Sequence, residues 1–150
     1  MNVYEASIQY RVTGTYLHEA LDTPQKIVEY MAGAFDDSPL QEHFYVICLN
    51  RKNKPMCRHR ITSGIVNASL AHPREVFRTA VLATACAIIC VHNHPSGDPQ
   101  PSTADLTMTR RLKEASRIMD IDLIDHIVIG NREDDPTGRG YYSFAEVGTI

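Results

Sequence analysis

Two histidines and an aspartate in one short stretch of this sequence are spaced for metal chemistry. His92 and His94 follow an apolar run over residues 87–91, which we expect to be a buried strand that Pro95 ends. Side chains two residues apart on a strand point to the same face, so the two imidazoles should lie side by side. Imidazole nitrogens are common zinc ligands, which makes this strand end a candidate metal site.

Asp105 lies in the helix predicted for residues 102–119, on the side that should face the sheet. It comes three residues before an apolar stripe with helical spacing: Met108, Leu112, Ala115 and Met119. A buried lone carboxylate is costly unless it is paired or binds a metal. Together with His92 and His94, Asp105 would leave one ligand position open, which is typical of catalytic rather than structural zinc.

Ser102 and Asp105 also allow a simpler interpretation. Ser-x-x-Asp at a helix start is a capping box, which stabilises the helix without any metal. A hydrogen bond from one histidine to Asp105 is another alternative. The combination of a strand-end His-x-His, a short loop, and a Ser with an inward-facing Asp favours the metal site.

Length and composition indicate one globular domain. The chain has 150 residues, 43% hydrophobic and 22% charged, and a net charge of −3, which excludes a strongly basic nucleic-acid coat protein. No apolar run is long enough to span a membrane, and the N-terminus shows no signal-peptide pattern. The four cysteines lack C-x-x-C spacing and lie in or beside apolar segments. We therefore expect reduced core thiols, a cytoplasmic location and no membrane partner.

Strands and helices alternate along the sequence. Strands are expected at 3–12, 44–49, 56–66, 87–92, 123–129 and 141–144, and helices from Thr23-Pro24 to the Asp36–Pro39 segment, at 73–86 and at 102–119. This order predicts an α/β fold, with a mixed β-sheet flanked by helices on both faces. A right-handed crossover should lead from the strands at 44–66 through helix 73–86 to strand 87–92.

The spacing His-x-His-x7-Ser-x2-Asp resembles the motif of the JAB/MPN (JAMM) metalloprotease superfamily. Further blocks resemble its RadC branch, at residues 67–70, 72–77, 92–98, 125–127 and 143–144. The resemblance implies a JAB/MPN fold, related to the cytidine deaminase-like architecture. It implies a single domain over residues 1–150, with 1–38 a strand-helix N-terminal extension and 40–148 the RadC-like core.

The resemblance also implies roles for individual residues. The ligands of Zn2+ would be His92, His94 and Asp105, and Ser102 would hydrogen-bond the bound water or the oxyanion. The superfamily uses an upstream glutamate as general base. Glu42 stands at the matching place, and Glu75 is its competitor, although the first turn of a helix suits a glutamate for electrostatic reasons.

Asp125 has two interpretations, and His126 beside it has one. Asp125 could orient a zinc-bound imidazole by accepting its hydrogen bond, since ligating histidines nearly always have such a partner. The alternative is an exposed aspartate at a strand end. For His126, a lone histidine on a core strand, we expect a structural role.

The function implied by the resemblance is a zinc-dependent metallohydrolase that cleaves an amide bond in a peptide or isopeptide. Asn93 stands where deubiquitinating relatives have Ser or Thr, so ubiquitin-type substrates are not implied. A DNA-repair role is one alternative, with thin support from a few basic residues: Arg58, Arg60, Arg110, Arg111, Lys113 and Arg117. RadC proteins usually carry an N-terminal helix-hairpin-helix DNA-binding region. This sequence begins instead with the expected strand and helix, so we expect no DNA binding by that route. A non-catalytic interaction module is another alternative, and pairing of the 3–12 strand between chains would give a homodimer.

Overall fold

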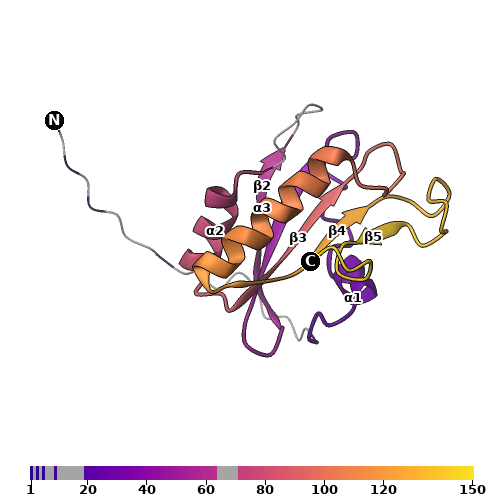
Figure 1. The fold of residues 1–150 in the computed structure, drawn as a ribbon. Helices are drawn as coiled ribbons and strands as arrows, with labels where there is room; N and C mark the ends of the chain where they lie inside the picture. Colours follow the sequence, from indigo (N-terminus) through magenta and orange to yellow (C-terminus); the bar gives the residue numbers. More distant parts are fainter. Residues whose placement is uncertain (2, 4, 6–8, 10–18, 64–70) are drawn as a thin grey trace.

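A computed structural model of the chain describes residues 1, 3, 5, 9, 19–63 and 71–150 (Figure 1). Most of the strand expected at 3–12 and the end of the strand expected at 56–66 lie outside these residues. So does the sequence block at 67–70.

A mixed sheet forms the centre of the described structure. Its five strands in chain order are β1 (His43–Leu49), β2 (Pro55–Ser63), β3 (Ala87–Asn93), β4 (Asp122–Ile129) and β5 (Tyr141–Ser143). Their order in the sheet is β2-β1-β3-β4-β5; β3 and β4 are parallel and the other neighbours antiparallel. Every residue of β1 and β3 is buried, as expected for central strands with apolar sequences.

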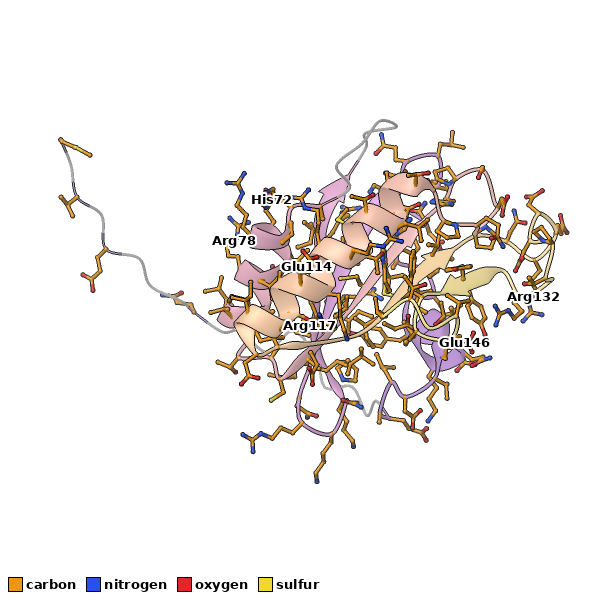
Figure 2. The ribbon with its side chains drawn as sticks, viewed as in Figure 1. His72, Arg78, Glu114, Arg117, Arg132 and Glu146 are labelled. Atoms are coloured by element: carbon orange, nitrogen blue, oxygen red, sulfur yellow. The ribbon has the colours of Figure 1, made fainter. Side chains whose placement is uncertain are left out.

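Helices cover both faces of this sheet, which confirms the predicted α/β architecture (Figure 1). One face packs against α2 (Pro73–Leu82) and α3 (Thr103–Met119), through Phe77 and Leu112 among others. The opposite face packs against α1 (Pro24–Tyr30) through Ile27. Charged residues such as Glu114 and Arg117 are exposed on the outward side of α3 (Figure 2).

Local signals place the helix starts correctly, but two helices end earlier than predicted. Thr23 caps α1 by accepting from the Lys26 amide. α1 ends at Tyr30, before Gly33 with its positive φ of 75°, and turns follow where we expected more helix. α2 ends at Leu82 rather than residue 86, because the chain turns at Thr84, whose φ is 52°.

The connections bring distant parts of the sequence together at one end of the sheet. α3 links the adjacent parallel strands β3 and β4, and α2 links β2 to β3, which run parallel on either side of β1. The carboxyl end of β3 therefore lies beside the start of β1 and close to the start of α3. Among the helices of the described ranges, none is long and apolar enough to cross a bilayer.

Candidate metal centre

The two histidines of the motif lie at the carboxyl end of β3. His92 is fully buried between Phe44 of β1 and Val128 of β4 in the sheet register. His94 follows β3, and its amide donates to the Ile129 carbonyl at 2.8 Å. The predicted side-by-side arrangement is confirmed, because the His92 and His94 Nε2 atoms are 3.1 Å apart.

Asp105 and Glu42 complete a compact group with these imidazoles. Asp105 Oδ1 is 3.3 Å from His92 Nε2, and Asp105 Oδ2 is 3.5 Å from His94 Nε2. One ligand atom from each of Glu42, His92, His94 and Asp105 lies within 4.8 Å of the others. The group contains the three predicted ligands and the first-choice glutamate.

The capping box is present, and it engages one oxygen of Asp105, so the other oxygen stays available as a ligand atom. Asp105 Oδ2 accepts from the Ser102 amide at 2.6 Å and from the Ser102 hydroxyl at 2.7 Å, while the Asp105 amide donates back to Ser102 Oγ. Asp105 Oδ1 is buried, and no group in the described ranges donates to it in hydrogen-bonding geometry. A buried acceptor without a donor is costly, and a bound cation removes that cost.

The hydrogen bond of His94 Nδ1 leaves the Nε2 atom of the same ring as a second acceptor, directed at the point that Asp105 Oδ1 also faces. His94 Nδ1 lies 2.9 Å from the Asp98 carbonyl oxygen, which can only accept, so Nδ1 carries the proton. In the neutral ring Nε2 then presents a lone pair toward His92 and Asp105. Converging imidazole nitrogens and carboxylate oxygens fit a zinc ion, which binds these donor types.

Electrostatics in the group follow from burial and from close contacts. Burial opposes ionisation of Asp105, but the adjacent imidazoles and Ser102 outweigh it and lower the pKa of the carboxyl. Burial raises the pKa of Glu42. A carboxyl that holds a proton more readily than usual suits a group that must both take and return one.

Glu75, the competing glutamate, lies elsewhere. It is in the first turn of α2 and lines a cavity with His72 and Arg111 between the N-terminal ends of α2 and α3. No ligand of the metal group is among the residues that line this cavity. The structure thus brings Glu42, and not Glu75, to the predicted ligands.

The role expected for Asp125 is wrong in both of its forms. Asp125 is buried, and its carboxylate accepts from the Ser143 hydroxyl at 2.6 Å and from the amides of Ala145 and His126. The imidazoles of the site have other partners, Asp98 for His94 and His126 for His92. Asp125 ties β4 to the chain after β5 instead.

His126 is the residue that sequence reasoning missed. Its Nε2 atom lies 2.9 Å from His92 Nδ1, on the side of His92 away from the metal group. The sequence signal was a polar residue inside an apolar strand. Its meaning depends on the register that sets His126 opposite Cys90, after an irregularity between Ile88 and Ile89.

Comparisons with known proteins show the family of this chain. The family model described as "RadC-like JAB domain" matches residues 21–149. A UPF0758 protein of Chlorobium phaeovibrioides is 46% identical over 136 residues, which cover 87% of this chain and 57% of the relative. A UPF0758 protein of Geobacillus sp. is 54% identical over 93 residues, covering 62% of this chain and 41% of the relative. The chain thus spans about half the length of these relatives, and in fold, motif and sequence it belongs to the family of RadC-like JAB domains.

Proposed function

We propose that this domain is a zinc-dependent hydrolase that cleaves an amide bond in a peptide or protein. One observation carries the proposal: two imidazoles and two carboxylates converge within 4.8 Å, and Asp105 Oδ1 is buried there without a donor. His92, His94 and Asp105 would hold the ion. When bound, zinc supplies Lewis acidity, which makes water more acidic and stabilises negative charge on a substrate oxygen.

Glu42 would move the proton. Its carboxylate takes a proton from the water that attacks the substrate carbonyl, and burial of the side chain favours the protonated form that this step produces. The same proton then passes to the amine nitrogen as the C–N bond breaks. Glu42 is half-buried at the entrance to β1, so its carboxyl lies within the group and still reaches solvent.

Ser102 can stabilise the oxyanion without releasing Asp105. The Ser102 hydroxyl now donates to Asp105 Oδ2, but the Ser102 amide donates to the same oxygen at 2.6 Å. If the hydroxyl turns toward a substrate oxygen, the backbone bond still holds the carboxylate. A hydroxyl aimed at developing negative charge is the donor that amide hydrolysis needs.

Two of the basic residues that supported a nucleic-acid role make contacts with other residues of the protein. Arg60 pairs with Asp37 at 2.8 Å, and Arg58 donates to the Tyr30 carbonyl at 3.0 Å. Contacts of this kind reduce the charge available to phosphates, so we favour the hydrolase.

The test is metal analysis together with an unbiased search for cleavage. Protein purified without added metal should contain about one zinc per chain, and His94→Ala should lose most of it. Wild-type protein incubated with a mixture of unstructured peptides and lysine-linked isopeptides should give new amine termini, detected by mass spectrometry, that His94→Ala does not give. Wild-type protein that binds no zinc, or binds zinc and cleaves neither bond type, contradicts the proposal.

A further inference from the structure

Three hydrogen bonds run through the interior from the backbone of one metal ligand to the ring of another. Thr109 Oγ1 of α3 lies 2.7 Å from the Asp105 carbonyl oxygen and 2.6 Å from His126 Nδ1. His126 Nε2 lies 2.9 Å from His92 Nδ1. Thr109, His126 and His92 are all fully buried, so water does not compete for these contacts.

The direction of each bond follows from what each atom can do. The Asp105 carbonyl only accepts, so the one hydroxyl proton of Thr109 is donated to it. Thr109 Oγ1 must then accept from His126 Nδ1, which carries a proton. In a neutral ring His126 Nε2 is therefore an acceptor, and His92 Nδ1 donates to it. His92 is left with a bare Nε2 that points at Asp105 and His94.

Packing and burial hold His126 in this arrangement. Its ring stacks on Phe144 at 4.9 Å between centroids, with 9° between the planes, and Phe44 lies 5.4 Å away. The ring is fully buried, and its two nitrogens contact Thr109 and His92 instead of a carboxylate, which favours the neutral form. A neutral ring carries one proton, so a partner that holds this proton on Nδ1 leaves Nε2 as an acceptor.

We propose that His126 and Thr109 are positioning residues that set the tautomer of His92 and so keep its Nε2 lone pair directed at the metal. This role rests on the metal-binding part of the proposed function and does not depend on the substrate. It gives His92 the outer hydrogen-bond partner that zinc-bound imidazoles generally have. Here that partner is the His126 imidazole, itself hydrogen-bonded to the Thr109 hydroxyl, instead of a carboxylate.

Thr109→Val is the decisive variant because it removes the hydroxyl and keeps the side-chain shape. His126 Nδ1 then has no acceptor, so the favoured His126 tautomer carries its proton on Nε2 and the proton of His92 moves to its own Nε2. Zinc must displace that proton, and the dissociation constant should rise about 10–100-fold, measured by competition with a chelator. Thr109→Ser, which retains the hydroxyl, should restore near wild-type affinity.

Thr107→Val is the matched control. Thr107 lies on the same helix and makes the same kind of bond, from its hydroxyl to the Thr103 carbonyl at 2.9 Å. It is exposed, however, and within the described residues its hydroxyl makes no hydrogen bond to a histidine. Its substitution should leave zinc affinity unchanged. An equal loss of zinc affinity in Thr107→Val and Thr109→Val would mean that helix stability is responsible, and not the hydrogen bonds from Thr109 through His126 to His92.

A spectroscopic measurement tests the tautomer directly and needs no activity. Long-range 1H–15N spectra of the zinc-free protein, above neutral pH, should show the His92 proton on Nδ1 in the wild type and on Nε2 in Thr109→Val. The proton on Nε2 of wild-type His92 would overturn the proposal, as would a folded Thr109→Val protein with wild-type zinc affinity. Zinc binding with the expected tautomers but without amide cleavage would overturn the hydrolase function alone.

Discussion

Asn93 holds the backbone on both sides of Glu42. The His43 amide donates to Asn93 Oδ1 at 2.8 Å, and Asn93 Nδ2 donates to the Gln41 carbonyl at 2.9 Å. Asn93 lies between the two histidines in sequence, and its side chain is directed to the start of β1. One amide therefore links the strand that carries the imidazoles to the segment that carries the glutamate.

We expect Asn93→Ala to impair hydrolysis while zinc stays bound. Glu42 would lose the two hydrogen bonds that hold its neighbours, and about 1–3 kcal/mol of stability would be lost because the substitution removes an acceptor from the buried His43 amide. Turnover per bound zinc, measured beside the unfolding free energy in urea, checks this. Asn50→Ala is the control, since Asn50 closes the turn before β2 through its bonds to the Lys52 and Lys54 amides, away from the site. Equal losses of turnover in both variants would refute this role of Asn93.

Glu42→Gln should abolish most hydrolysis and keep the metal. The amide cannot accept the proton of the attacking water, and positioned general bases contribute about 10²–10⁴-fold. Zinc content by elemental analysis and initial cleavage rates should separate the two effects. Glu75→Gln makes the same chemical change outside the metal group and should cleave normally. The reverse result would assign the base to Glu75.

Ser102→Ala should destabilise the start of α3. It removes the hydroxyl that accepts from the Asp105 amide and donates to Asp105 Oδ2, and the loss of such a cap costs about 1 kcal/mol. Denaturant unfolding of zinc-free protein measures the change without a contribution from metal. Ser102→Thr keeps a capping hydroxyl and should unfold close to wild type. If the two variants are equally stable, the hydroxyl contributes nothing as a cap.

Cys57 should react with iodoacetamide at neutral pH. Two of the four cysteines, Cys57 and Cys86, are exposed, so the expectation that all are core thiols is wrong for these two. Cys57 is opposite Cys48 in the β1–β2 register, and its interaction with the buried Cys48 thiol lowers the pKa of Cys57 to about 7. The thiolate is the nucleophile, so alkylation should speed up as pH rises through about 7 and level off above it.

Variants at Cys48 isolate the cause of this reactivity. Cys48→Ala removes the thiol, so the pH midpoint of Cys57 alkylation should move to higher pH. Cys48→Ser keeps a hydroxyl in its place, so the midpoint should stay near that of the wild type. Peptide mass spectrometry resolves Cys57 from Cys86 in the same sample. A midpoint that is the same in Cys48→Ala and in the wild type would show that the Cys48 thiol has no effect.

Local patterns in the sequence predicted most of the described elements, apart from the ends of two helices, and part of the site. Apolar runs predicted the buried strands β1 and β3, and Thr23, Pro73 and Ser102 marked helix starts, because burial patterns and caps act over a few neighbouring residues. The His-x-His spacing likewise settles that the two imidazoles share a face, whatever the strand pairs with.

Only the tertiary structure decided which residues meet across elements. Glu42 was preferred over Glu75 by resemblance, but its place in the group depends on β1 lying beside β3 with Phe44 opposite His92. The contact of His126, instead of Asp125, with His92 has the same origin. Adjacent residues on a strand face opposite sides, so the irregular register between β3 and β4 determines which of them reaches His92. That register is set by long-range pairing and packing, which no short stretch of sequence records.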